Sequence, residues 1–149
     1  MSETFKSINT NQALSLWMIY SIMCLSCFLY PIIVYGVGEV GRGPLQLNPI
    51  IPLTHELNPL RYQIILWSYA SVTFFCVSFL SRTMSLDPPT ENQPLFTQVL
   101  RRMLLLLAMA DSICIAGMAY ALITGDLKNL IYVCLLALIL KSMQHPLKR

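Results

Sequence analysis

The sequence contains few charged residues. Lys and Arg number 10 and Asp and Glu number 7, so only 11% of the 149 residues are charged, against about 25% in an ordinary soluble domain. A soluble fold of this size needs far more polar surface to stay dispersed. Hydrophobic residues make up 56% of the chain and form long blocks rather than amphipathic stripes. The composition therefore predicts an integral membrane protein that is surrounded by the lipid bilayer.

The sequence also lacks the patterns of most enzymes and nucleic-acid-binding proteins. Its two histidines, His55 and His145, lie outside the apolar blocks, which argues against a haem or bis-histidine site within the membrane. His-x-x-x-His, Gly-x-Ser-x-Gly and a pair of acids on one helix are all missing, and no basic run contains interleaved aromatics. We therefore expect no enzymatic activity, no catalytic residue, no cofactor and no nucleic-acid partner.

The cysteines do not lie in loops, where those of a secreted disulfide framework are found. All of them fall inside apolar blocks: Cys24, Cys27, Cys76, Cys114 and Cys134. Cys24 and Cys27 are three residues apart and share a helix face, which makes them candidates for a metal site. Small thiols that fill helix contacts are the simpler interpretation. The sequence accordingly predicts no metal site.

Four apolar blocks predict four transmembrane helices in one all-α domain, a bundle that covers residues 1–149. The spans are expected at about 13–37, 62–81, 102–124 and 129–143, each a possible bilayer crossing. Pro31 is expected to kink the first of them. Pro94 can open the helix that continues into the third span. Gly125 can end that helix in a left-handed conformation, and the short turn makes the third and fourth helices antiparallel.

The longest loop, residues 38–61, follows the first span. Gly36, Gly38 and Gly41 have the G-x-G-x-x-G spacing of dinucleotide-binding proteins. That motif must follow a strand and open a helix, whereas this one follows a membrane helix and precedes Pro44. We therefore interpret it as a flexible exit from the bilayer. The apolar residues that follow, within 50–57, are candidates to lie on the membrane surface.

The basic residues predict the orientation of the chain. Seven lie on the side of the amino terminus and three on the other. The seven are Lys6, Arg82, Arg101, Arg102, Lys141, Lys148 and Arg149, and the three are Arg42, Arg61 and Lys128. Cytoplasmic loops carry the excess of Lys and Arg. Both termini and loop 82–101 are thus expected in the cytoplasm, and loop 38–61 outside, in a bacterial inner membrane.

Asp111 is the one acid inside an apolar block, about 13 Å along the helix from Arg102. A carboxylate at that depth costs roughly 2.5–3.5 kcal/mol on insertion scales, so a compensating partner is expected. Three interpretations are open, and the first is a hydrogen bond to a hydroxyl of a neighbouring helix. The candidates for it are Ser71 and Thr73 on the second span, and Tyr20 and Ser21 on the first.

The second interpretation pairs Asp111 with Lys141, which approaches from the cytoplasmic end of the fourth span. The simpler expectation for Lys141 is that its long side chain extends to the lipid headgroups. In the third interpretation Asp111 binds and releases a proton or a cation. The candidate ion-binding residues are then Asp111, Thr73, Ser71 and Lys141.

Small residues line the third span around Asp111. Ala108, Ser112 and Ala116 lie at i, i+4 and i+8, and Gly117 with Ala121 forms a second pair of small residues four apart. Such stripes let helix backbones approach closely. The third span is therefore predicted to be the packing centre of the bundle or of an oligomer.

The segment Ala108–Gly117 resembles the carboxylate helix of rotor-ATPase proteolipid (c) subunits. In that family an acid follows alternating small residues and a glycine stands six positions later, as Gly117 follows Asp111. The resemblance implies that Asp111 is an ion-binding carboxylate. The chain differs from that family in its second span, which lacks repeated alternate glycines, and in its two additional spans. As a whole it resembles small bacterial four-helix membrane proteins.

Together these features predict a membrane component without enzymatic activity. It is expected to be structural or accessory, and to pack through its third helix as a homo-oligomer or as a subunit of a membrane complex. The alternative is translocation of a proton or cation by Asp111.

Overall fold

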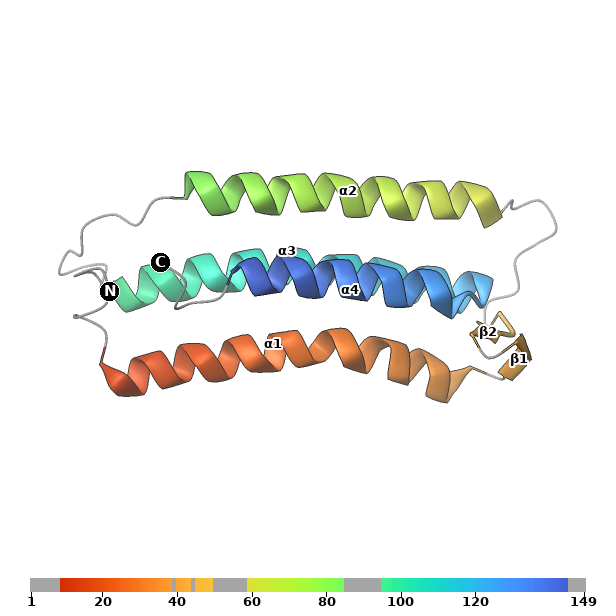
Figure 1. The fold of residues 1–149 in the computed structure, drawn as a ribbon, viewed down its shortest axis with the longest axis horizontal. Coiled ribbons are helices and arrows are strands. Elements are labelled where there is room, and N and C mark those ends of the chain that lie inside the picture. Colours follow the sequence, from red (N-terminus) through yellow and green to blue (C-terminus); the bar gives the residue numbers. More distant parts are fainter. Residues whose placement is uncertain (1–8, 39, 44, 50–58, 85–94, 145–149) are drawn as a thin grey trace.

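The structure, a computed structural model, describes residues 9–38, 40–43, 45–49, 59–84 and 95–144. It is all-α, with four helices and a small β-hairpin (Figure 1). The helices are α1 (Thr10–Val37), α2 (Pro59–Thr83), α3 (Leu95–Thr124) and α4 (Leu127–Met143), and the strands are β1 (Val40–Gly43) and β2 (Gln46–Leu47). The two histidines, the apolar part of loop 38–61 and the middle of loop 82–101 lie outside the described residues.

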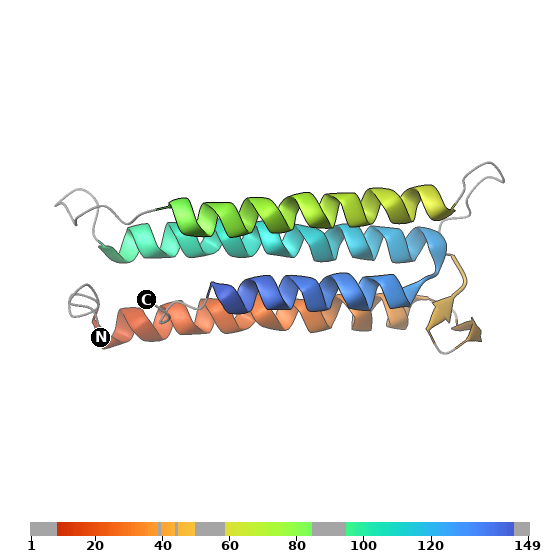
Figure 2. The same ribbon diagram turned by 45° about the horizontal axis from the view of Figure 1, so that its top comes forward.

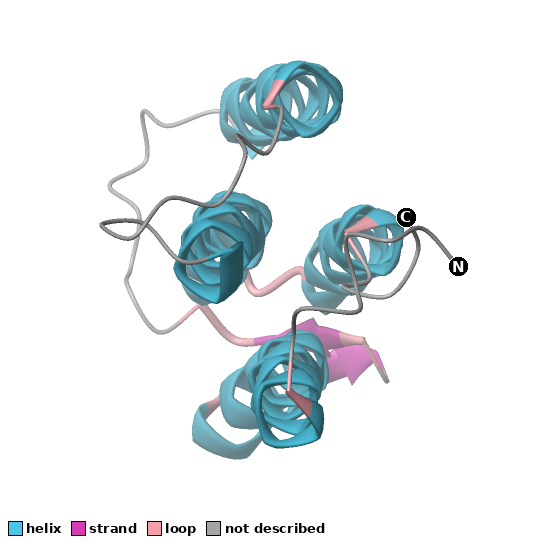
Figure 3. Cartoon of the chain, turned by 90° about the vertical axis from the view of Figure 1, so that its left-hand side faces the viewer, coloured by secondary structure: helices cyan, strands magenta, loops and turns pink. Residues whose placement is uncertain are grey.

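The four helices run along one axis, α1 and α3 in one direction and α2 and α4 in the other (Figure 1). Seen from the end, α3 and α4 lie between α1 and α2 (Figure 3). Turning the view shows α2 beside α3, and α4 beside α1 (Figure 2). Since α3 contacts α1, α2 and α4, a residue on α3 can meet partners from every other helix.

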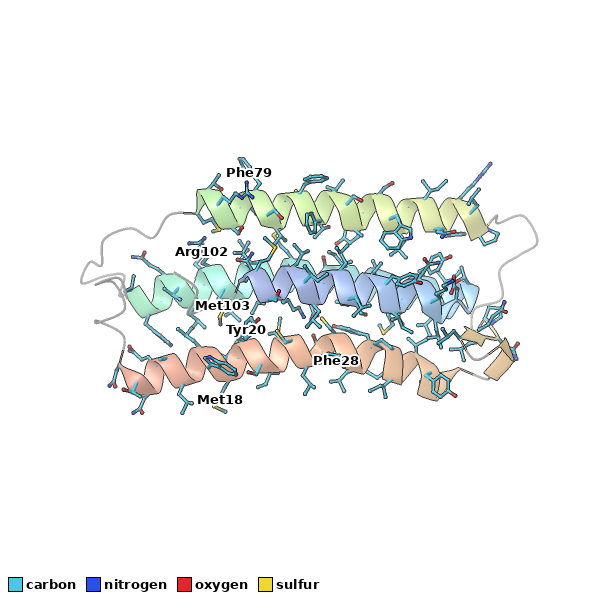
Figure 4. The ribbon with its side chains drawn as sticks, in the orientation of Figure 1. Met18, Tyr20, Phe28, Phe79, Arg102 and Met103 are labelled. Carbon is cyan, nitrogen blue, oxygen red and sulfur yellow. The ribbon has the colours of Figure 1, made fainter. Side chains whose placement is uncertain are left out.

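Three helices are long and apolar enough to cross a membrane: α1, α2 and α3, with 28, 25 and 30 residues. The fourth helix has only 17 residues, which corresponds to about 25 Å at the usual helical rise. It therefore falls short of the bilayer core of about 30 Å. The outward-facing side chains suit lipid: Met18 and Phe79 point away from the bundle (Figure 4) and are 58% and 67% exposed.

The helices begin earlier than the apolar blocks predict. The first begins at Thr10, three residues before the expected span. The third begins at Leu95, seven residues before the expected span, as predicted for a helix that opens at Pro94. Asn9 precedes α1, and its backbone N–H donates to Gln12 Oε1 at 3.2 Å, half of a capping box. The first turns of α3 are held by a cluster of buried apolar residues, which includes Tyr20 and Met103 between α1 and α3 (Figure 4).

A hairpin occupies part of the segment that we interpret from sequence as a flexible exit. Strands β1 and β2 pair in antiparallel fashion, and the chain around β2 also pairs with the α3–α4 turn. Leu47 N donates to Gly125 O at 2.7 Å, and Leu127 N to Leu45 O at 3.1 Å. These bonds satisfy main-chain groups that a helix end leaves without partners. Tertiary hydrogen bonds therefore hold this hairpin in place, and the local sequence alone does not predict them.

Gly125 ends α3 in the left-handed conformation, with φ +73°, as predicted. A Cβ atom at this position would overlap Leu47 O. We expect Gly125→Ala to lower the free energy of unfolding by more than about 1–2 kcal/mol, the usual cost of a left-handed residue with a side chain, because the overlap with Leu47 O adds to that cost. Urea unfolding in mixed micelles, followed by circular dichroism, measures it. An unchanged midpoint would contradict the prediction.

Candidate functional site

The candidate site is an ion pair in the interior of the bundle. Lys141 Nζ of α4 lies 2.8 Å from Asp111 Oδ1 of α3, and the two side chains are 0% and 15% exposed. Asp111 is the seventeenth residue of the 30-residue α3, so the carboxylate lies near the middle of the bundle. A buried ion pair is stable only when hydrogen bonds satisfy its remaining donors and acceptors.

Lys141 has a protein acceptor for each of its N–H groups. A protonated lysine has three donors, and Nζ bonds to Asp111 Oδ1, to Ser26 Oγ at 3.0 Å and to the carbonyl oxygen of Met23. Ser26 and Met23 both belong to α1. The ammonium group thus joins α1, α3 and α4.

Both oxygens of Asp111 also accept hydrogen bonds from α1. Ser26 Oγ donates to Oδ1 at 2.8 Å, and Tyr30 Oη donates to Oδ2 at 3.2 Å. Ser26 Oγ lies 2.7 Å from the Met23 carbonyl as well, but its single proton can serve one acceptor at a time. The carboxylate is the stronger acceptor because it is charged.

The structure corrects the expectation that Lys141 extends to the headgroups. Lys141 lies two residues before the end of α4, which suggests an exposed position. However, α4 ends well short of the level where α1 and α3 begin (Figure 1). The end of α4 is therefore flanked by its neighbours, and Lys141 is completely buried. Among the interpretations left open by the sequence, the geometry is that of the Asp111–Lys141 pair, with hydroxyl groups added.

The hydroxyls come from residues that the sequence does not single out. The structure brings Asp111 together with Ser26 and Tyr30, whereas Tyr20 packs with Met103 and Leu107. Helix register explains the difference: Asp111 is 16 residues after the start of α3 at 95, and Ser26 is 16 residues after the start of α1 at 10. The span starts expected from sequence, 102 and 13, place Asp111 nine residues into its helix and therefore level with Ile22, next to the Ser21 named from sequence. The better register follows from Pro94, which the sequence already marks as the start of the third helix, together with the capping signal at Asn9.

The hydroxyls predicted on α2 lie elsewhere. Thr73 is buried, and Ser71 is exposed and lines a shallow groove along α2. Within the described residues, the hydrogen-bond partners of Asp111 are Ser26, Tyr30 and Lys141. The ion-binding set proposed from sequence is therefore only half assembled here.

The small residues of α3 occupy two faces. Gly117 and Ala121 are buried, and a Cβ at Gly117 would overlap Val133 of α4. Ser112 accepts a hydrogen bond from Tyr69 Oη of α2 at 2.8 Å. Ala116 is half-buried and Ala108 is exposed. The close approach between α3 and α4 thus depends on Gly117, and the other stripe borders α2 and lipid.

Two thiols adjoin the ion pair. Cys114 Sγ of α3 lies 3.8 Å from Cys27 Sγ of α1, and both residues are buried. One carboxylate oxygen of Asp111 and the two sulfurs all lie within 4.8 Å of one another. In the described part of the chain these are the residues that could hold a metal ion.

Loss of the Tyr30 hydroxyl tests the contribution of the hydroxyl groups. We expect Tyr30→Phe to destabilise the bundle by about 1 kcal/mol, the usual size for one hydrogen bond between membrane helices. Tyr35→Phe is the matched control, because Tyr35 is on the same helix and is 52% exposed. Thermal unfolding in detergent compares the two variants. Equal midpoints would show that the Tyr30–Asp111 bond does not stabilise the fold.

The sequence matches no protein-family model, and no curated protein and no solved structure is significantly similar to it. The resemblance of Ala108–Gly117 to the carboxylate helix of proteolipid subunits stays a prediction.

Proposed function

We propose that the protein is an integral membrane component without enzymatic activity, with a structural or accessory role. The observation that supports this is the use of Lys141: each of its N–H groups bonds to a group of the same chain. Because the partners come from α1 and α3, the Lys141 ammonium, which is costly to bury, holds three helices in register. An ionisable group inside a membrane bundle has to be paired in this way to be stable.

Translocation of a proton or cation by Asp111 is the alternative. An incoming cation has to compete with the Lys141 ammonium, which already lies 2.8 Å from Oδ1. Protonation of Asp111 would leave that ammonium without its counter-charge in a dry interior, which is unfavourable. The arrangement therefore favours a permanent structural pair over a carboxylate that, as the single charged ligand, loads and unloads a proton or cation during transport.

In this proposal all four helices lie in the bilayer, and both termini face the cytoplasm of a bacterial cell. The short helix α4 carries Lys141, whose side chain is buried against α1 and α3. This contact keeps α4 within the bundle at membrane depth. Removing the buried Lys141 from the count of basic residues changes the ratio of seven to three into six to three. The excess still lies on the amino-terminal side, as the positive-inside rule requires.

The proposed surface for self-association or for a partner subunit is the edge between α2 and α3. Ala108 and Tyr69 are exposed there, and the Tyr69–Ser112 hydrogen bond lies beside them. A small residue and polar groups facing lipid favour the approach of another helix. This keeps α3 as the packing helix of the proposed assembly, through its outer stripe.

A double variant that removes both charges separates the two functions. Asp111→Leu combined with Lys141→Leu contains no titrating group at the site but leaves no orphaned charge. For a structural component, we expect the double variant to migrate with the same apparent mass as the wild type on native gels of detergent-solubilised membranes. We also expect proteoliposomes of wild-type protein to show no proton or cation flux driven by pH or voltage.

Two results would overturn the proposal. One is flux in wild-type proteoliposomes that the double variant abolishes, which would establish translocation through Asp111. The other is wild-type protein that runs only as a monomer on native gels, both when it is solubilised directly from its membranes and after purification. Ala108→Leu is the variant for the association surface, and Leu104→Ala, one turn away and 40% exposed, controls for general changes of the lipid-facing side.

A further inference from the structure

The thiols beside the ion pair form a compact cluster of metal-ligand types. Asp111 and Cys114 are three residues apart on α3, so they lie on one face of that helix. Cys27 approaches them from α1, directly after Ser26, and is 3% exposed, while Cys114 is 0% exposed. The three ligand atoms lie within 4.8 Å of one another. Two rigid helices therefore hold two sulfur ligands and one oxygen ligand around a common point.

The spacing of the sulfurs fits tetrahedral coordination. Two thiolates bound to one Zn²⁺ at about 2.3 Å, at the tetrahedral angle, are separated by about 3.8 Å. The observed distance between Cys27 Sγ and Cys114 Sγ is 3.8 Å. A carboxylate oxygen as third ligand leaves one position for a water molecule, an arrangement common among zinc sites.

The charges at the site also balance when a divalent ion is bound. Binding releases one proton from each thiol to solvent and forms two metal–sulfur bonds, so the cluster contributes two thiolates and the Asp111 carboxylate. The ion's double charge and the Lys141 ammonium, 2.8 Å from Asp111 Oδ1, compensate these three negative charges. A site without net charge is the arrangement that a membrane interior tolerates.

We propose that Cys27, Cys114 and Asp111 bind one thiophilic divalent cation of the Zn²⁺ type in the interior of the bundle. This inference goes beyond the proposed structural role and does not depend on it. The ion binds with the Lys141 ammonium still in place, so it does not replace the Asp111–Lys141 pair. Hard cations such as Mg²⁺ are excluded as occupants, because they prefer oxygen ligands. The lysine beside the site keeps Asp111 oriented in the absence of the ion.

Co²⁺ is the first probe, because tetrahedral thiolate coordination gives it intense visible bands and sulfur-to-metal charge-transfer absorption. The purified wild-type protein is kept reduced with a phosphine. We expect one equivalent of Co²⁺ to produce the visible bands and the charge-transfer absorption, and Zn²⁺ to abolish them. Cys27→Ser and Cys114→Ser should lose the charge-transfer absorption. Cys76→Ser is the matched control and should retain it, because Cys76 is exposed on α2.

No charge-transfer absorption in the wild type, or equal absorption in the Cys27→Ser and Cys76→Ser variants, would overturn the proposal. X-ray absorption on the wild-type protein with Zn²⁺ tests sulfur coordination of the ion directly. It needs no variant, so the result does not depend on whether a variant folds. We expect two sulfur scatterers at about 2.3 Å. A shell of oxygen and nitrogen alone would exclude the site. Neither measurement reports on assembly or ion flux, so their failure is distinct from failure of the proposed function.

Discussion

Replacement of Asp111 by leucine is expected to lower the free energy of unfolding by about 3–5 kcal/mol. Removing one partner of a buried ion pair has this cost because the remaining charge loses its compensation. Here the remaining charge is Lys141, which is 0% exposed. Denaturant titration in mixed micelles, followed by helical circular dichroism, measures the loss.

The control for this prediction is a second substitution. Lys141→Leu in the Asp111→Leu background removes the orphaned ammonium and should recover most of the lost stability, since apolar replacement of a buried pair is often close to neutral. Lys128→Leu applies the same change to an exposed lysine of the same helix and should leave the midpoint almost unchanged. If Asp111→Leu and the double variant unfold together, the two charges are not coupled, and the pair does not hold the helices.

Gly117→Val is expected to destabilise the bundle by about 3 kcal/mol, the upper part of the range for overfilled cores. A Cβ atom at Gly117 would overlap the Val133 side chain and lie 3.2 Å from Leu130 Cδ1. Both neighbours are buried on α4, so a larger side chain has to push α4 away from α3. The displacement also moves Lys141, on the same helix, away from Asp111. Thermal unfolding measures the loss, and cysteine crosslinking between α3 and α4 reports the separation.

Gly36→Val is the matched substitution, because Gly36 lies near the end of α1 and a Cβ there meets nothing within 4 Å. Valine is a better helix former than glycine, so this variant should be as stable as the wild type or slightly more stable. Stability changes of opposite sign for the two substitutions would show that glycine is needed at 117 because α3 and α4 approach closely there. Equal destabilisation would mean that glycine acts at both positions through backbone flexibility.

The register of α1 against α3 illustrates how far sequence patterns extend. The apolar blocks correctly predict helices, because lipid-facing segments need long runs of apolar side chains. Their edges do not mark helix ends, since polar residues at either end continue a helix when a cap or a tertiary contact supports them. The helices α1 and α3 therefore extend to Thr10 and Leu95, and the polar partners of Asp111 are Ser26 and Tyr30 rather than Tyr20 and Ser21.

The sequence by itself determined the helices as elements, the membrane-spanning length of three of them, and the need of Asp111 for a compensating partner. Each of these follows from composition, from the length of apolar runs, or from the cost of a lone carboxylate in an apolar segment. Only the tertiary structure decided which groups compensate that carboxylate: Lys141 from a helix that ends inside the bundle, and hydroxyls from α1. It also placed Cys27 beside Cys114. The physical reason is that these partners are 30 to 87 residues apart in sequence, and only the packing of the helices sets their relative height and rotation.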